Sequence, residues 1–246
     1  MKTANWNPWH GCKKLSEGCR YCYVYRQDGR YNPEIDSSEV RRTSSFDLPL
    51  KRKRDKSFKL EPGTLVFTCF TSDFFVDDAD EWRKDAWRMI KERNDLIFYI
   101  FTKRIDRFNI SLPDDWGTGY ENVIIGCTIE NQKRADYRLP IFKELPIKHK
   151  TIICAPLLES INLRPYLDKT IEEVAASGES GNDARVCNYD WILDIREQCI
   201  EADIPFCFHQ TGAKFLKNGK LYRINRRFQI MQAKKAGIDF KITHNG

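Results

Sequence analysis

Short runs of apolar, β-branched and aromatic residues recur along the chain, roughly one every thirty residues. They occupy residues 64–70, 96–101, 122–128, 151–155, 171–176 and 204–209. Most of them are continuously apolar rather than alternating, which is typical of strands buried on both faces of a parallel sheet. The runs therefore predict six parallel strands in an α/β fold.

Helical patterns separate most of these runs. Residues 78–93 and residues 188–202 each place apolar side chains on one face at intervals of four. Residues 131–144 give a weaker pattern because Pro140 interrupts it. Strand and helix in alternation predict βαβ units, and six such units would form an open or partial barrel.

Polar residues mark where two of these helices should begin. Asp77 or Asp78 is placed to cap the first helix, and Asn188 is placed to cap the second. Between residues 157 and 167 the helical signal is poor, so the form of that connection stays open. No internal repeat is visible.

Two basic segments lie outside this pattern. Residues 26–62 form a polar insertion with at most one helix, and within it residues 41–59 carry eight Lys and Arg against two Asp. Residues 214–246 carry nine Lys and Arg against one Asp and are expected to form a tail, a hairpin or a lid. We therefore expect a main domain over residues 1–213 and a basic C-terminal extension. Such clusters favour a polyanionic partner, with a solvated basic surface as the alternative.

The chain shows neither a signal peptide nor an apolar run near the ~20 residues that span a bilayer. We therefore expect a cytoplasmic protein without a membrane partner. In that compartment the nine cysteines are expected to be thiols and metal ligands rather than disulfides.

Three cysteines near the N-terminus, Cys12, Cys19 and Cys22, follow the spacing Cys-x6-Cys-x2-Cys. Gly11 and Gly18 allow tight turns, so a short loop can present all three sulfurs together. Thiolates are the ligands that select iron–sulfur clusters or zinc.

The number of ligands separates two interpretations of this motif. A closed structural zinc site requires four ligands, and His10 is the candidate for the fourth. A 4Fe–4S cluster held by three cysteines leaves one iron for the amino and carboxylate groups of S-adenosylmethionine. We expect the cluster, with zinc as the alternative. The other cysteines are expected to be mainly small core residues.

The cysteine motif resembles that of radical S-adenosylmethionine enzymes. Their usual spacing is Cys-x3-Cys-x2-Cys, with an aromatic residue just before the third cysteine. Tyr21 matches that aromatic residue, whereas the first gap is longer here.

The whole chain is similar to a phage and mobile-element family of three-cysteine-motif, radical-enzyme-like proteins whose function is poorly known. The resemblance covers nearly all of residues 5–219. The matching motifs are, in chain order, Trp6-Asn7-Pro8, Gly11-Cys12, Ser16-x-Gly18-Cys19-x-x-Cys22-Tyr23, Ser72-Asp73-Phe74-Phe75, Thr102-Lys103-Arg104, Gly126-x-Thr128-x-Glu130-Asn131, Pro156-Leu157-Leu158, Gly178-Glu179-Ser180-Gly181-x-x-Ala184-Arg185 and Pro205-Phe206-x-Phe208-x-Gln210. The resemblance implies a partial (β/α)6 barrel of the radical S-adenosylmethionine type, with the cluster at its open end.

The chain departs from that family at three positions. Family members often carry Glu, Lys and Trp where this chain has Ala155, His209 and Thr211. These positions are candidates for substrate contact, so the substrate need not be shared with the family.

Polar residues follow the predicted strands, where parallel α/β sheets bind their ligands. The candidates for contact with S-adenosylmethionine are Ser72, Asp73, Lys103, Thr128, Glu130, Asn131, Glu179 and Ser180. Thr102, Arg104, Glu159 and Gln210 occupy comparable positions. Carboxylates and amides would accept from ribose hydroxyls, and Lys103 or Arg104 would pair a carboxylate or a phosphate.

These features predict a radical S-adenosylmethionine enzyme in which the reduced cluster generates a 5′-deoxyadenosyl radical that abstracts hydrogen from a substrate. Nucleic acid or a nucleotide is the expected substrate, because both basic segments favour a polyanion. The expected electron donor is a reduced flavodoxin or ferredoxin. The alternative is a zinc- or cluster-containing nucleic-acid-binding protein that does not cleave S-adenosylmethionine.

Overall fold

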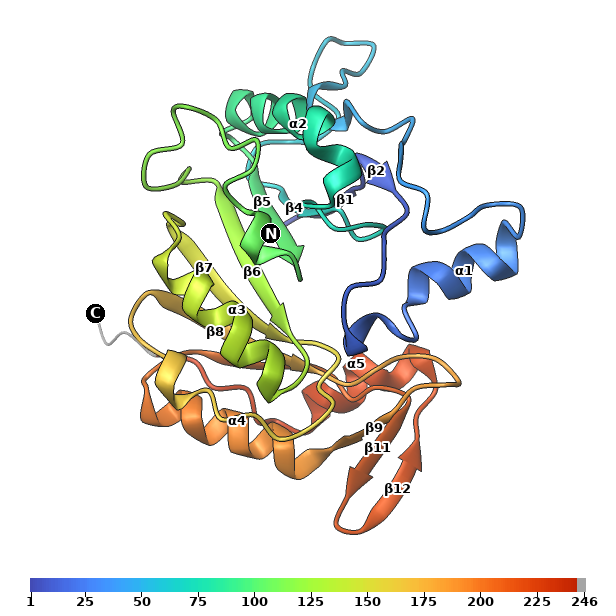
Figure 1. Ribbon diagram of the computed structural model, residues 1–246, viewed down its shortest axis with the longest axis vertical. Helices are drawn as coiled ribbons and strands as arrows, with labels where there is room; N and C mark the ends of the chain where they lie inside the picture. Colours follow the sequence, from blue (N-terminus) through green and yellow to red (C-terminus); the bar gives the residue numbers. More distant parts are fainter. Residues whose placement is uncertain (243–246) are drawn as a thin grey trace. The chain divides into compact units, whose positions relative to one another are not determined.

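The computed structural model describes residues 1–242 and is a mixed α/β structure built on a seven-stranded sheet (Figure 1). The strand order is β1-β4-β5-β6-β7-β8-β10. These strands are β1 (Thr3–Trp6), β4 (Leu65–Thr68), β5 (Ile97–Thr102), β6 (Val123–Ile129), β7 (His149–Cys154), β8 (Ile171–Ser177) and β10 (Phe206–Gln210). The pairs β4–β5, β7–β8 and β8–β10 are parallel, as the apolar runs predict, and the pair β1–β4 is also parallel.

The chain divides into two compact units. The first unit comprises residues 1–15, 24–126 and 145–149, and the second comprises residues 16–23, 127–144 and 150–246. Cys12 therefore belongs to the first unit, whereas Cys19 and Cys22 belong to the second.

The first unit buries one face of β1, β4 and β5. Val66, Phe98 and Ile100 are fully buried there, and Trp6 of β1 packs edge-on against Phe98 with ring centroids 5.7 Å apart. Helix α2 (Asp80–Glu92) contributes the buried Trp87 to this core. The same unit holds nearly all of α1 (Tyr23–Tyr31), the short pair β2 (Trp9–His10) and β3 (Arg41–Arg42), and the 3₁₀ turns Leu48–Leu50 and Ile105–Arg107.

The second unit contains helices α3 (Gln132–Glu144), α4 (Tyr189–Glu201) and α5 (Arg226–Lys235). The basic C-terminal extension forms a hairpin of β11 (Lys214–Lys217) and β12 (Lys220–Arg223), followed by α5. Strand β11 also pairs in parallel with β9 (Val186–Asn188), so the extension is built into this unit. Figure 1 shows α5 beside this small sheet.

All six predicted strands are present, with ends that differ from the prediction by at most two residues. The predicted cap of α4 is also confirmed, because the Asn188 side chain accepts a hydrogen bond of 3.0 Å from the Asp190 amide. Of the 26–62 insertion, only the part that belongs to α1 is α-helical, in agreement with the limit of one helix. The connection between β7 and β8 contains a 3₁₀ turn, Arg164–Tyr166, and no α-helix.

The helix predicted over residues 131–144 is present as α3, and it continues through Pro140. Leu139 and Phe142 are buried on its inner face, and this burial outweighs the lost backbone hydrogen bond. One local prediction was wrong. Asp77 and Asp78 do not cap α2 with their side chains. Both lie in the 3₁₀ turn Asp77–Ala79 that precedes α2. Their carboxylates pair with the Lys13 ammonium, at 3.7 Å for Asp77 and 2.7 Å for Asp78.

Strand β1 was not predicted. It is a four-residue strand at one end of the strand order, and its residues Thr3 to Trp6 pair with Leu65 to Thr68 of β4. Its sequence, Thr-Ala-Asn-Trp, has no apolar run of its own. Its partner supplies the hydrogen bonds that make it a strand.

Within residues 1–242, no helix combines the length and the apolar character needed to cross a membrane.

Gly178, directly after β8, provides a test of this packing. A Cβ atom there would lie 2.2 Å from the Thr211 carbonyl oxygen and 3.0 Å from the Cys187 Cβ. We expect Gly178→Ala to lower the free energy of unfolding by about 1–3 kcal/mol or more. The added methyl group would overlap a backbone carbonyl, which cannot rotate away as a side chain can.

The matched control is Gly29→Ala in α1, where a Cβ meets nothing within 4 Å. Alanine is expected to stabilise that helix position by about 0.5–1 kcal/mol. Urea denaturation measures both variants, and shifts of the same sign would contradict the packing argument.

Candidate functional site

The three motif cysteines differ from the other six in exposure. All nine cysteines are free thiols, as expected for a chain without disulfides. Cys12, Cys19 and Cys22 are half-buried, whereas five of the remaining six are buried and only Cys207 is half-buried. The motif cysteines are therefore exposed enough for a ligand to reach each of them.

Burial also makes most of the cysteines outside the motif harder to deprotonate. It raises the pKa of the Cys69 and Cys154 thiols well above the ordinary value, and it raises the pKa of Cys187 and Cys199 to about 12. Burial likewise raises the pKa of Cys207 to about 11. A metal needs thiolate ligands, so these five cysteines are poor donors at neutral pH.

In the first unit, backbone hydrogen bonds hold the segment around Cys12. The Gly11 amide donates to the Thr71 carbonyl at 3.1 Å, and the Cys12 amide donates to the Ser37 carbonyl at 2.8 Å. The Ser72 hydroxyl donates to the Gly11 carbonyl. Gly11 has φ +90°, and a Cβ there would lie 2.2 Å from the Glu39 carbonyl oxygen, so glycine is required.

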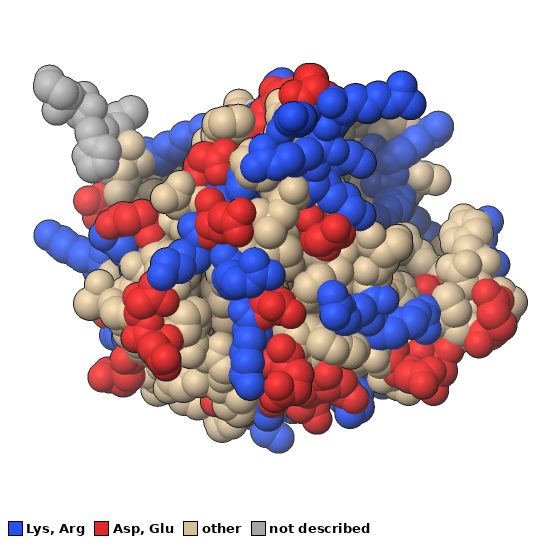
Figure 2. Space-filling view, turned by 90° about the horizontal axis from the view of Figure 1, so that it is seen from above, with Lys and Arg blue, Asp and Glu red and all other residues tan. Residues whose placement is uncertain are grey.

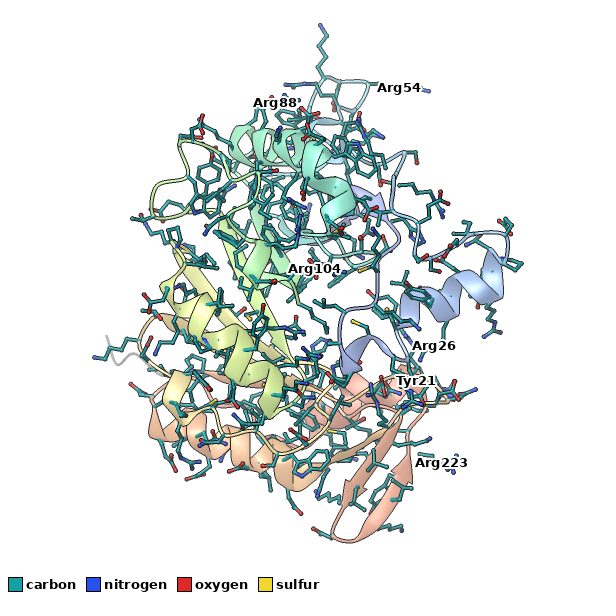
Figure 3. All side chains as sticks on the ribbon, in the orientation of Figure 1. Tyr21, Arg26, Arg54, Arg88, Arg104 and Arg223 are labelled. Carbon is teal, nitrogen blue, oxygen red and sulfur yellow. The ribbon has the colours of Figure 1, made fainter. Side chains whose placement is uncertain are left out.

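Arg104 places a positive charge beside Cys12. One guanidinium nitrogen lies 3.5 Å from the Cys12 sulfur, and the other donates to the Lys13 carbonyl at 2.6 Å. Arg104 is buried, and it is labelled in Figure 3. A guanidinium next to a sulfur favours the thiolate form that binds metals.

Asp73 organises the strand ends of the first unit. Its Oδ1 accepts from the Thr102 hydroxyl at 2.7 Å, and its Oδ2 accepts from the Lys103 amide at 2.9 Å. Arg104 lies 3.5 Å from the same Oδ2. The buried Asp73 carboxylate therefore joins the end of β5 to the loop after β4 and orients Arg104 toward Cys12.

In the second unit, Glu130 holds the residue before Cys19. Its Oε1 accepts from the Gly18 amide at 3.3 Å, and its Oε2 binds Arg138 at 2.7 Å. The same Arg138 nitrogen donates to the Thr128 carbonyl at 2.7 Å. The Glu130 side chain is completely buried and the Arg138 side chain is 1% exposed, so neither charge is solvated by water.

A second ion pair holds the same segment from another strand end. Arg185 binds both carboxylate oxygens of Glu179, at 2.7 and 2.9 Å, and donates to the Glu17 carbonyl at 2.9 Å. The Glu17 side chain binds Arg134 at 2.9 Å, and this hydrogen bond lowers the pKa of Glu17 to about 2. Arg185 also lies 5.4 Å from the ring centre of Tyr21.

The remaining candidates have local roles or polar neighbours. Asn131 caps α3 by accepting from the Arg134 amide at 3.0 Å, and Glu159 accepts from the Gln132 amide at 2.8 Å. The side-chain amide of Gln210 donates to the Gly178 carbonyl at 3.1 Å. Ser180 is half-buried with polar interactions of its own.

Three of the predicted strand-end side chains therefore bind backbone next to a motif cysteine: Ser72 and Arg104 beside Cys12, and Glu130 beside Cys19. The Tyr25 hydroxyl donates to the Cys12 carbonyl. Arg134 and Arg138 were missed as members of these networks. The i, i+4 spacing of Arg134 and Arg138 on one helix face was the available signal.

A flat aromatic surface lies at the ends of β4 and β5. Phe70 and Phe101 stack with ring centres 5.5 Å apart and planes 7° apart, and Phe67 and Tyr99 extend the stack. All four side chains are half-buried or exposed, with Phe70 the most exposed at 37%. The surface offers planar apolar contact to a ring-shaped ligand.

His10, the alternative zinc ligand, already binds through one ring nitrogen. Its Nε2 lies 2.8 Å from Asp28, which also accepts from the Ser37 hydroxyl at 2.6 Å. Burial would raise the pKa of Asp28, but the hydrogen bonds from Ser37 and His10 lower it. Across residues 1–242, no group of three or more His, Cys, Asp or Glu side chains is arranged to hold a metal ion. Metal binding by the cysteine motif stays a prediction.

One large cavity lies away from these residues. It has a volume of about 470 Å³ and is lined in the first unit by Trp87, Arg88, Leu112 and Tyr120, among others. None of the predicted site residues lines it.

The fold and the site define an α/β protein whose half-buried N-terminal thiols lie beside backbone held by buried strand-end charges. A protein-family model described as "Protein of unknown function (DUF5131)" matches residues 2–241. The chain belongs to this family. No curated protein and no solved structure matches it.

Proposed function

We propose that the protein is a radical S-adenosylmethionine enzyme that acts on nucleic acid or a nucleotide, with a 4Fe–4S cluster on Cys12, Cys19 and Cys22. The observation that carries the proposal is the contrast among the cysteines. Three thiols are half-buried, and strand-end side chains hold the backbone next to two of them, Cys12 and Cys19. Burial disfavours the thiolate form in five of the other cysteines.

The donor set fits the proposed cluster. Three thiols are the ligands that a cluster with one open iron requires. When bound, the reduced cluster cleaves S-adenosylmethionine and supplies a 5′-deoxyadenosyl radical. In this proposal the seven-stranded sheet is the partial (β/α)6 barrel of such enzymes, and a cytoplasmic flavodoxin or ferredoxin provides the electron.

The chain's own residues would bind and orient the ligands. Arg104 stabilises the Cys12 thiolate, and the Glu130–Arg138 pair fixes Gly18 next to Cys19. Lys103 would pair the methionyl carboxylate. The stack of Phe67, Phe70, Tyr99 and Phe101 would hold a purine ring and exclude water.

The test is anaerobic reconstitution of the full chain with iron and sulfide, followed by incubation with dithionite and S-adenosylmethionine. We expect a brown protein with about four irons per chain, absorbance near ~400 nm, and 5′-deoxyadenosine detected by chromatography. A colourless protein that binds one zinc ion would contradict the proposal and favour the zinc-containing nucleic-acid-binding alternative. A cluster without 5′-deoxyadenosine, with or without added nucleic acid, would also contradict it.

A further inference from the structure

We propose that the C-terminal part of the second unit binds single-stranded nucleic acid and takes one unstacked base into a cavity lined by aromatic side chains. This inference makes the nucleic-acid substrate of the proposed function specific. Its evidence does not involve the cysteine motif.

The cavity lies among β10, β11, β12 and the ends of α4 and α5. Its volume is about 270 Å³, and its lining includes Tyr189, Phe208, Phe215, Tyr222, Lys217 and Lys235. Ligand pockets usually have volumes of roughly 300–1,000 Å³, so this one suits a group the size of a nucleobase. Four aromatic rings and two ammonium groups are the side chains that bind a base and its phosphate.

The hairpin register explains why these side chains converge. Phe215 lies directly opposite Tyr222 across the antiparallel pair, and Lys217 lies opposite Lys220. Residues two apart on a strand share a face, so all four belong to the face that lines the cavity. Phe215 then packs against Tyr189 at 5.7 Å and against Phe208 at 5.9 Å.

Cations accompany the aromatic rings. The Lys217 ammonium lies 4.4 Å from the ring centre of Tyr189, and the Lys220 ammonium lies 5.2 Å from that of Tyr222. On α5, Arg227 lies 4.5 Å from the ring centre of Phe228. Alternating cations and aromatic rings are typical of surfaces that follow a single strand.

The charge on this surface is of one sign. Residues 214–238 contain eight Lys and Arg and no Asp or Glu. Arg223 projects from the hairpin in Figure 3. A phosphate chain supplies the negative charge that this segment lacks.

The surface also exposes apolar area that a base would cover. Tyr222 is 41% exposed, Phe228 is 37% exposed and Met231 is 51% exposed. In a duplex the bases are stacked and paired, so contact with these side chains requires a single strand or a flipped base. The aromatic residues therefore favour single strands over duplex.

The test uses the full chain, before and after cluster reconstitution, with fluorescein-labelled 12-nucleotide DNA, the same sequence as RNA, and a blunt DNA duplex. Fluorescence anisotropy is measured from 50 to 200 mM KCl. We expect at least one single strand to bind about 10-fold or more tighter than the duplex, with affinity falling steeply as salt rises. Comparison of the single-stranded DNA with the single-stranded RNA shows whether the protein prefers deoxyribose or ribose.

Tyr222→Ala is expected to weaken single-strand binding about 5- to 100-fold while leaving the salt slope unchanged, because it removes stacking and no charge. Tyr31→Ala is the matched control: Tyr31 is an exposed tyrosine of the first unit with Arg30 at 5.2 Å from its ring centre. It is expected to bind like the wild type. Lys235→Ala should reduce the salt slope by about 0.7.

The inference is overturned if duplex binds as tightly as both single strands, if affinity ignores salt, or if Tyr222→Ala matches Tyr31→Ala. Its failure is distinct from that of the radical proposal. Binding is measured without S-adenosylmethionine, and 5′-deoxyadenosine formation is measured with the Tyr222 side chain in place.

Discussion

Replacing Cys19 with Ala is expected to remove bound iron and sulfide from the reconstituted protein and to abolish 5′-deoxyadenosine formation, a loss of at least about 100-fold. Cys19 ends the 3₁₀ turn Glu17–Cys19 and follows Gly18, the residue that Glu130 holds. Two remaining thiols cannot hold a cluster that needs three. Iron analysis, absorbance and product chromatography measure the effect.

Cys207→Ala is the control for this variant. Cys207 is also half-buried, but it lies in β10, and burial raises the pKa of its thiol to about 11. It is expected to keep the wild-type iron content and product. If both variants lose iron equally, or if Cys19→Ala keeps its iron, the cysteine motif does not hold the metal.

Glu130→Gln is expected to lower the free energy of unfolding by about 3–5 kcal/mol. The substitution keeps the shape of the side chain but leaves the Arg138 guanidinium, 1% exposed, as an unpaired buried charge. It also weakens the acceptor that holds the Gly18 amide. Urea denaturation followed by circular dichroism measures the loss.

Glu201→Gln is the matched control in the same unit. Glu201 binds Arg164 with equally short contacts, 2.6 and 2.9 Å, but both side chains are about half exposed. Water solvates both charges there, so little change in stability is expected. Adding Arg138→Met to Glu130→Gln should recover part of the loss, because the unpaired charge is removed. Equal effects of Glu130→Gln and Glu201→Gln would contradict the role of burial.

Cys19→Ala and Glu130→Gln test two different roles at the cysteine motif. Cys19 would bind the metal, whereas Glu130 positions the backbone beside it. If Glu130→Gln also lowers the iron content while the protein stays folded, the strand-end charges prepare the segment for metal binding. If the iron content is unchanged, Glu130 serves stability alone.

The charged surface of the first unit is a separate feature. Figure 2 shows Lys and Arg side chains gathered on part of one face, with carboxylates interspersed over the rest. Arg54, from the basic segment at residues 41–59, projects outward in Figure 3, and Arg52 lies 4.0 Å from the ring centre of Phe58. The polyanion prediction for this segment stays open.

Much of the fold was predictable because burial leaves a local trace. β4 to β8 and β10 each appear in the sequence as an apolar run. The prediction that such runs are buried on both faces does not hold for β4 and β5, where buried residues alternate with half-buried ones because the second face carries the aromatic stack. Asn188 was predictable as a cap because its partner, the Asp190 amide, is two residues away. The cysteine spacing likewise needs no tertiary information.

Other features required the tertiary structure. Strand β1 is a strand because β4 lies beside it, and Asp77 and Asp78 pair with Lys13 rather than capping α2. The predicted site carboxylates show the same dependence. Glu130 lies 112 residues from Gly18, and its hydrogen bond to that amide has no trace in the sequence near either residue.

The sequence by itself determined six of the seven strands of the main sheet, their parallel arrangement and the set of thiols, because each depends on composition over a few neighbouring residues. Only the tertiary structure decided that the strand-end charges hold the cysteine segments. It also decided that Tyr189, Phe208 and Tyr222 line one cavity. Hydrogen-bond partners and cavity walls depend on which distant residues the fold brings within a few ångströms, and periodicity along the chain carries no information about that.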